Sequence, residues 1–203
     1  MEITAISEIH GAVINNIFDA TESQLENLRK ESSKFGHKVR VIVHPFYEVE
    51  DKSNMKTSAV IRLLKSDSDQ RLPILIFEES DKCSLYTQSS NTLENQKGAG
   101  IYLVPTVIGA PHPTGGWEKL EDILKKAGIK NMLIGGRYLT YQDEMDGVAD
   151  YQSHFKNVLE RQGYNPPSSL AGCVGIVAGI FSKSDFNIQL SNISYPLNPI
   201  SFK

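Results

Sequence analysis

Three residues of this chain have side chains suited to acid–base or nucleophilic chemistry, at positions where predicted strands end or a predicted helix begins. His44 and His112 each follow a predicted strand, and Cys173 would lie in the first turn of Leu170–Phe181 if that segment is helical. An imidazole can take up and return a proton near neutral pH. A cysteine at a helix N-terminus has a depressed pKa and can act as a nucleophile. We therefore predict that these three residues are the catalytic candidates.

Residues that could bind a substrate stand in the same loops. The turn before the predicted helix at 117–127 offers backbone N–H groups and the positive end of the helix dipole, which favour an anion. An arginine after the next strand could add a guanidinium for a carboxylate or phosphate. The turn is no known nucleotide motif, because neither GxxxxGK[ST] nor GxGxxG occurs. We predict a small anionic molecule as the partner, no identifiable cofactor, and these binding candidates: Glu48, Glu78, Thr114, Gly115, Gly116 and Arg137.

Each candidate also has a simpler structural interpretation. A loop histidine is often just hydrogen-bonded or exposed, and a glycine turn before a helix is often an ordinary N-cap. A free cysteine is often a small buried hydrophobe. Glu78 and Glu79 begin an acidic run that could be a solvated helix start. If their loops are neighbours, the two histidines and a glutamate could form a metal or acid–base site. However, HxH and HExxH spacings are absent, so we predict no metal.

The element that must position these residues is Ile101–Tyr138, which has the pattern of a strand, a loop, a helix and a second strand. Ile101–Ile108 is apolar on both faces, as in a buried parallel strand, although Pro105 could end it near Val104. Apolar residues then recur at helical spacing up to Ala127, and Gly128 is suited to a C-cap. Ligands of such sheets bind beyond the carboxyl ends of the strands, where our candidates stand.

The remaining segments extend the same architecture. Strands are predicted at 39–43, 72–77 and 186–190, and helices at 54–65 and from about 143 to 163. Gly172, Gly175 and Gly179 favour a helix at 170–181, whereas strict alternation of elements would favour a strand. We predict an α/β fold, a three-layer domain with a mostly parallel sheet and helices on both faces. Residues 1–37 form a helical N-terminal addition to the α/β domain at 38–203, with a capping box at Thr21 and Gln24.

Composition narrows the class of protein. Of the 203 residues 40% are hydrophobic and 22% charged, which suits a soluble domain with a sizeable core. A net charge of −3 argues against nucleic acid as a partner. The longest apolar run is 12 residues, too short to span a membrane, and the first residues lack the basic start of a signal peptide. Two distant cysteines suggest free thiols, so we expect a cytoplasmic protein.

The pairing of NMLIGG with the later GCVGIVAGIF resembles the C-terminal half of the isochorismatase-like cysteine hydrolases, where a glycine-ended strand precedes a helix opening with Cys-Val. The resemblance covers about a quarter of the chain. That family also has an aspartate at the end of its first strand and a mid-chain lysine. Here Val43-His44 stands in place of the aspartate, no lysine has a matching place, and about 35 residues separate Gly136 from Cys173. We therefore assign the chain to no family from its sequence.

Three functions remain open from the sequence. The first is a small-molecule enzyme, a hydrolase or transferase, acting on an anionic metabolite by histidine acid–base chemistry, with Cys173 as a second candidate nucleophile. The second is a non-catalytic binding or regulatory domain that uses the same turns. The third is a structural or assembly protein whose N-terminal helices mediate self-association as a homo-oligomer. Whether the chain is an enzyme is thus undecided by its sequence.

Overall fold

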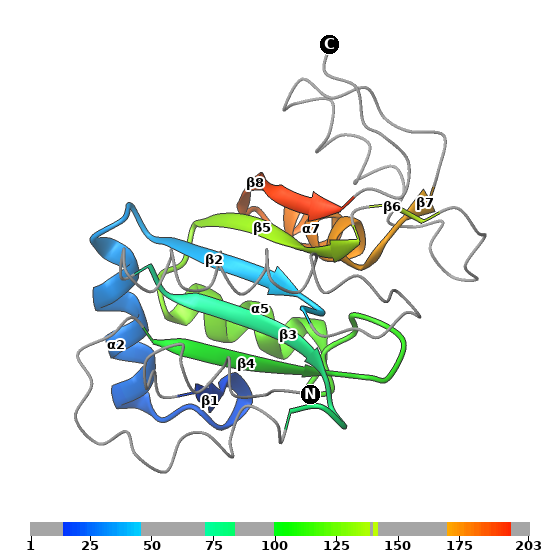
Figure 1. Cartoon of the computed structure of the whole chain (residues 1–203). Coiled ribbons are helices and arrows are strands. Elements are labelled where there is room, and N and C mark those ends of the chain that lie inside the picture. Colours follow the sequence, from blue (N-terminus) through cyan, green and yellow to red (C-terminus); the bar gives the residue numbers. More distant parts are fainter. Residues whose placement is uncertain (1–13, 46–71, 84–99, 139, 142–169, 196–203) are drawn as a thin grey trace.

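The computed structural model describes residues 14–45, 72–83, 100–138, 140–141 and 170–195, and every structural statement below concerns these ranges (Figure 1). The elements are β1 (Ile14–Asn16), the 3-10 helix η1 (Ile17–Asp19), α2 (Glu22–Ser33), β2 (Lys38–Val43), β3 (Ile74–Glu79), β4 (Ile101–Thr106), α5 (Trp117–Lys126), β5 (Asn131–Tyr138), β6 (Thr140–Tyr141), β7 (Leu170–Ala171), α7 (Cys173–Lys183) and β8 (Asn187–Tyr195).

Six strands form one sheet in the order β1-β4-β3-β2-β5-β8, and each neighbouring pair is parallel. The arrows in Figure 1 accordingly point the same way, so the strands end together at one side, which we call the carboxyl edge. The short strands β6 and β7 pair antiparallel in a separate sheet. The predicted α/β fold with a mostly parallel sheet is confirmed.

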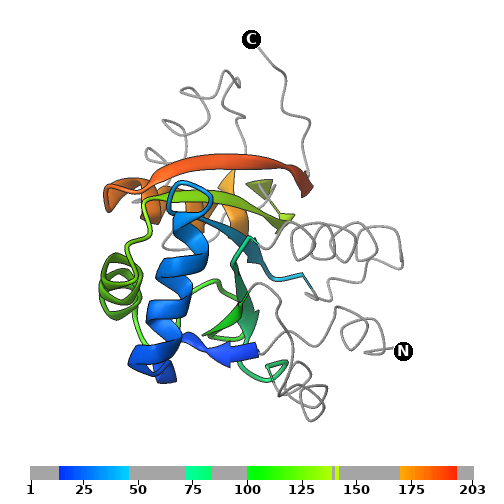
Figure 2. The ribbon, with the colours of Figure 1, turned by 90° about the vertical axis from the view of Figure 1, so that its left-hand side faces the viewer.

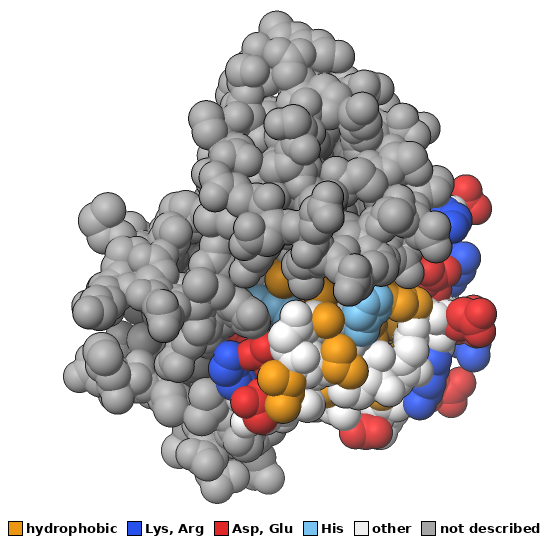
Figure 3. Space-filling view, turned by 90° about the vertical axis from the view of Figure 1, so that its right-hand side faces the viewer, with side chains coloured by type: hydrophobic (Ala, Val, Ile, Leu, Met, Phe, Trp, Pro, Cys, Tyr) orange, Lys and Arg blue, Asp and Glu red, His pale blue; other side chains and the backbone are white. Residues whose placement is uncertain are grey.

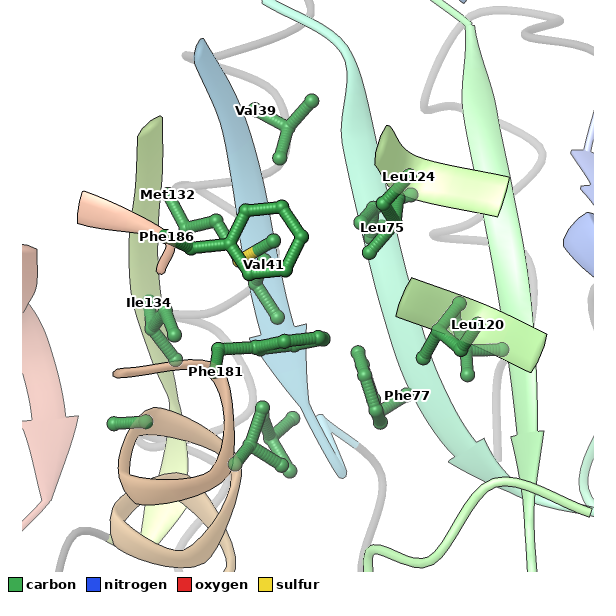
Figure 4. Packing of buried hydrophobic residues seen from close by; sticks show 14 of the residues in the cluster. Val39, Val41, Leu75, Phe77, Leu120, Leu124, Met132, Ile134, Phe181 and Phe186 are labelled. Atoms are coloured by element: carbon green, nitrogen blue, oxygen red, sulfur yellow. The ribbon is translucent and has the colours of Figure 1, made fainter. Parts of the chain in front are cut away.

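The three described α-helices pack on one face of the six-stranded sheet (Figures 1 and 2). Leu28 of α2, Leu120 of α5 and Phe181 of α7 belong to one buried cluster with alternate residues of the strands, among them Val41 and Phe77 (Figure 4). The strand residues that point to the other face are buried as well, for example in β3. Burial on both faces explains why the strands are continuous apolar runs, as parallel strands of layered α/β proteins are.

The helix boundaries follow local signals that the sequence carries. The Thr21 hydroxyl accepts a hydrogen bond from the Gln24 N–H at 3.3 Å, and the Gln24 side chain accepts one from the Thr21 N–H at 2.7 Å. This is the predicted capping box, and α2 begins directly after it. Gly128 has a φ of +72° just beyond α5, where a left-handed residue ends a helix. Of the two alternatives that the sequence left open for 170–181, the structure shows the helix, because α7 follows the short strand β7.

The structure differs from the sequence-based predictions at two places, upstream of α2 and at the end of β4. The apolar residues upstream of α2 form β1 and η1, and β1 joins the main sheet beside β4. Strand β4 runs through Pro105 to Thr106 instead of ending near Val104. The Pro105 carbonyl accepts from the Thr114 N–H at 2.8 Å, so the backbone polar groups of Pro105 point towards that loop and away from β3. Because an N–H at this position would not bond to β3, the proline leaves the pairing of β4 with β3 intact. The predicted helices at 54–65 and 143–163 lie outside the described residues.

Candidate functional site

His44 is the first residue beyond β2, and its imidazole reaches across the sheet. His44 Nε2 lies 3.1 Å from Thr106 Oγ1 at the end of β4. Because β3 lies between β2 and β4, this hydrogen bond bridges two strand spacings, which is about 10 Å between backbones. Both side chains are fully buried, each with 0% exposure. The bond therefore joins two polar groups at the carboxyl edge that the sheet would otherwise hold apart.

The backbone of His44 is in the left-handed region with a φ of +48°. This conformation costs a non-glycine residue roughly 1–2 kcal/mol and persists only where the surroundings hold it. Here the His44 N–H donates to the Phe77 carbonyl at 2.8 Å, which continues the pairing of β2 with β3 for one residue. The chain thus ends the strand and turns the imidazole over β3.

Burial lowers the pKa of His44 to about 4, against an opposing effect of the Glu79 carboxylate and with a further lowering by Lys82. The imidazole is therefore neutral at neutral pH. A neutral imidazole can accept a proton, and a negative charge brought beside it would raise its pKa towards the neutral range. His44 is consequently suited to act as a base towards an anionic partner.

Glu79, the last residue of β3, is a buried acid at this edge, with 3% exposure. Its carboxylate accepts a hydrogen bond from the Gly109 N–H at 2.7 Å and pairs with the Lys82 ammonium. Burial works to raise the pKa of Glu79, but the hydrogen bonds from Lys82 and Gly109 outweigh it and hold the pKa below its usual range. Glu79 is thus ionised at neutral pH.

Glu78 was predicted as a substrate-binding residue of a loop, and the acidic run beginning there as a possible solvated helix start. The structure places Glu78 and Glu79 inside β3, both buried, so the solvated interpretation is wrong. One Glu78 oxygen accepts from the Glu79 N–H at 3.1 Å. The two acids point to opposite faces because side chains alternate along a strand, and Glu79 shares the helix-covered face with Phe77.

His112 lies at the same carboxyl edge, in the loop after β4, but its ring has a different partner from that of His44. The Trp117 indole N–H donates to His112 Nδ1 at 3.1 Å, so Nδ1 is the acceptor atom of this ring. Trp117 in turn stacks on Phe77, with ring centroids 5.8 Å apart. His112 is half-buried and anchored to the start of α5.

The turn at 114–116 precedes α5 as predicted, and two of its three N–H groups are already engaged. Thr114 N–H donates to the Pro105 carbonyl, and Gly116 N–H to the Pro113 carbonyl at 2.9 Å. A Cβ on Gly115 would lie 2.6 Å from the Phe18 ring, so this glycine permits close packing on η1. These contacts account for the glycines structurally. Anion binding by Thr114, Gly115 and Gly116 stays a prediction.

Arg137 and the glycines before it lie within β5 and not in a loop after it. The reason is the close approach of β5 to β2 and α7. A Cβ on Gly136, whose φ is +148°, would lie 2.3 Å from the Val43 carbonyl oxygen and 3.0 Å from Val174 Cγ2. The segment is thus an irregular stretch of strand, with register shifts on either side of Gly136. Substrate binding by Arg137 stays a prediction.

Cys173 is the first residue of α7, as expected, but its thiol is not activated there. Burial raises its pKa to about 12, although its own backbone N–H works in the opposite direction, and the charge of Glu79 raises it further. The expected depression of the pKa is therefore wrong, because loss of hydration outweighs the helix terminus. A nucleophilic role would need a base to remove the thiol proton.

The remaining candidate, Glu48, lies outside the described residues. Among the residues that the structure does describe, no group of three or more histidine, cysteine, aspartate or glutamate side chains is arranged to hold a metal ion. The described helices also include none with the length and apolar character needed to cross a membrane.

Three polar residues of the site were missed in the sequence: Glu79, Lys82 and Thr106. A signal for two of them was present. In Leu75-Phe77-Glu79 and Tyr102-Val104-Thr106, the period-2 apolar pattern ends on a polar residue that faces the same side as the core residues before it. A polar residue that completes the buried face of a strand at its carboxyl end is a site candidate.

The carboxyl edge therefore brings together His44, Thr106, Glu79 and Lys82, with Cys173 within the electrostatic influence of Glu79. Figure 3 looks onto this edge and shows histidine side chains among hydrophobic ones, with charged side chains towards the rim. The arrangement combines a neutral imidazole, a buried hydroxyl and an ionised carboxylate, which are the parts of a proton-transfer site. Comparison with known proteins gives no match to a family model, a curated protein or a solved structure.

Proposed function

We propose that this chain is a small-molecule enzyme, a hydrolase or transferase, in which His44 acts as the acid–base group at the carboxyl edge of the sheet. The observation that carries this proposal is the buried hydrogen bond of 3.1 Å between His44 Nε2 and Thr106 Oγ1. It places a base against a hydroxyl beyond the ends of parallel strands, where α/β proteins bind their ligands.

The electrostatics of His44 favour an anionic substrate. A pKa of about 4 makes the free imidazole a weak base, and a general base works best with a pKa near the working pH. A bound carboxylate or phosphate would stabilise the imidazolium and move the pKa of His44 upward. Substrate binding would thus switch on the base, which then takes a proton from water or from a hydroxyl nucleophile and returns it to the leaving group.

Among the described residues, Thr106 and Cys173 are the candidate nucleophiles that this imidazole could assist. Thr106 is the better placed of the two, because its hydroxyl already bonds to His44. The Cys173 thiol has a pKa of about 12 and would need the same base. Direct attack by water requires neither residue. All three routes depend on His44, so His44 is the residue to test first.

The test is a turnover assay with two matched histidine variants. His37 and His44 bracket strand β2, and both have positive φ values, of 59° and 48°. Asparagine tolerates this conformation, so H37N and H44N disturb the backbone equally little. The probes are nitrophenyl phosphate and N-carbamoyl amino acids, which are anionic at neutral pH, with products followed by absorbance and mass spectrometry. We expect turnover in the wild type and in H37N, and a loss of about 100-fold or more in H44N.

The outcome separates the alternatives. Turnover that survives in H44N would remove the base assigned here. Binding of a carboxylate or phosphate probe without turnover, seen as a raised melting temperature, would favour the non-catalytic binding domain. The assembly alternative has less support from the fold, because Ile17 and Leu28 of the N-terminal segment pack into the core of this same domain.

A further inference from the structure

Glu79 connects two segments of the carboxyl edge through its two carboxylate oxygens. Oε1 accepts from the Gly109 N–H in the loop after β4 at 2.7 Å, and Oε2 pairs with Lys82 in the turn after β3. Lys82 N–H also donates to the Glu79 carbonyl at 2.9 Å, so this turn is folded against its own strand. Glu79 thus links the loop after β4 to the end of β3.

The linked loop, residues 107–112, is closed on itself and begins directly after Thr106. Val107 N–H donates to the His112 carbonyl at 2.9 Å, and Thr106 forms an isolated antiparallel β-bridge with Pro113. Gly109, at the tip, has a φ of +80°, a conformation that glycine adopts without strain. Because the loop is closed at its base, a hydrogen bond at its tip fixes its orientation relative to Thr106.

The charge of Glu79 also reaches the imidazole. Glu79 and Lys82 are the described charged groups that act on His44, and they oppose each other, the carboxylate raising the pKa of His44 and the ammonium lowering it. The same carboxylate contributes to the raised pKa of Cys173. One buried acid thus influences both titratable residues that were predicted as catalytic at this part of the edge.

We propose that Glu79 is a positioning residue of this site: its carboxylate fastens the 107–112 loop beside Thr106 and presents to His44 the negative charge that stabilises the imidazolium. The catalytic meaning of this inference rests on the proposed function, since an imidazolium forms only if His44 accepts a proton. The structural part does not depend on any substrate: Glu79 holds the 107–112 loop, and its charge raises the pKa of His44.

The experiment uses E79Q, which keeps the size of the side chain and removes its charge. The matched control is E31Q, because Glu31 and Lys34 form an i,i+3 pair like that of Glu79 and Lys82 but on α2. Two readouts need no substrate: NMR titration of labelled histidine, with the His44 signal assigned from H44N, and hydrogen exchange of the Gly109 amide. We expect E79Q to keep His44 neutral to lower pH than the wild type. We expect E79M, which has a similar length but no oxygen to accept from the Gly109 N–H, to speed exchange at Gly109 about 10-fold or more, whereas E31Q changes neither readout.

A second variant guards against failure of E79Q to fold. K82Q removes the opposing charge, and we expect it to raise the pH at which His44 titrates. An unchanged His44 titration in folded E79Q or in K82Q would overturn the electrostatic part of the inference, and unchanged Gly109 exchange in E79M would overturn the fastening of the loop. If both readouts respond while no probe is turned over, the proposed function fails and the positioning of His44 by Glu79 stands.

Discussion

His44 Nε2 and Thr106 Oγ1 lie 3.1 Å apart although their strands are not neighbours, because the imidazole spans the end of β3. The two residues are 62 positions apart in the chain. Their bond thus reports directly on the packing of three strands at the carboxyl edge. Both groups are buried, so the free energy of the bond should be measurable in the stability of the folded chain.

A double-mutant cycle with H44N and T106V should reveal a coupling between these residues. Breaking a buried hydrogen bond costs about 1–3 kcal/mol, and residues in direct contact couple by about 0.5–3 kcal/mol. We therefore expect the double variant to be destabilised by less than the sum of the two single changes. Urea denaturation measures all four proteins, and H37N paired with T106V is the control. Strict additivity of H44N and T106V would contradict the contact.

The depressed pKa of His44 predicts a loss of stability in mild acid. The folded-state pKa is about 4 and the unfolded value about 6.5, so between these values the unfolded chain binds more protons. Stability from this residue is complete above about pH 6.5 and falls as the pH drops towards about 4. From pH 7 to pH 5 we expect a loss of about 2 kcal/mol.

The comparison that isolates this effect is wild type against H44N, because the carboxylates titrate in both proteins. Urea denaturation at a series of pH values gives the free energy of unfolding for each. We expect the two curves to converge as the pH falls. Parallel curves would mean that the pKa of His44 in the folded chain is close to its ordinary value.

Substitution of Gly136 tests the close approach of β5 to β2. G136A would place a Cβ 2.3 Å from the Val43 carbonyl oxygen, in a backbone conformation with a φ of +148°. Gly36 provides the matched control, because its φ is +68° and a Cβ added there would meet nothing within 4 Å. We expect G36A to cost about 1–2 kcal/mol from strain alone, and G136A to cost at least about 3 kcal/mol. Equal costs in chemical denaturation would show that the strands can separate locally.

The raised pKa of Cys173 predicts a thiol that resists alkylation. With C83S as the background, Cys173 is the only cysteine of the chain. At about pH 8, a thiol with a pKa of about 12 carries far less thiolate than an unperturbed cysteine, and burial adds a steric barrier. We expect iodoacetamide to react at least about 100-fold more slowly with the native protein than with the chain in urea. Fast native labelling would instead indicate an activated nucleophile.

Most of the secondary structure around the site could be predicted from local patterns. The capping box at Thr21, the apolar face ending at Ala127 and the left-handed Gly128 are signals within a few residues of one another. The elements that were misjudged depend on distant partners. The residues at 14–16 are a strand because β4 pairs with them, and Gly136 stays in a strand because Val43 approaches its backbone.

The residues of the candidate site also divide into those that local patterns predict and those whose role depends on residues distant in the chain. Strand ends carry ligand sites in α/β folds, so the sequence alone was enough to select His44, which the structure places at the carboxyl edge. Glu79 was not predicted as a site residue, because an acidic run is usually solvated. Its structural role comes from its burial and its bonds to Gly109 and Lys82. The pKa of Cys173 was misjudged for the same reason, because dehydration is a property of the surroundings and not of the helix terminus.

Local patterns in the sequence are sufficient to predict the alternation of buried strands and capped helices, because the apolar period and the capping residues act between residues close in the chain. The strand order follows from the tertiary structure, which places β3 between β2 and β4 and so brings His44 over to Thr106. The tertiary structure also decided which charges lose their water, and with them the pKa values of His44 and Cys173. Contacts across a sheet and desolvation depend on residues far apart in the chain, and local patterns do not specify them.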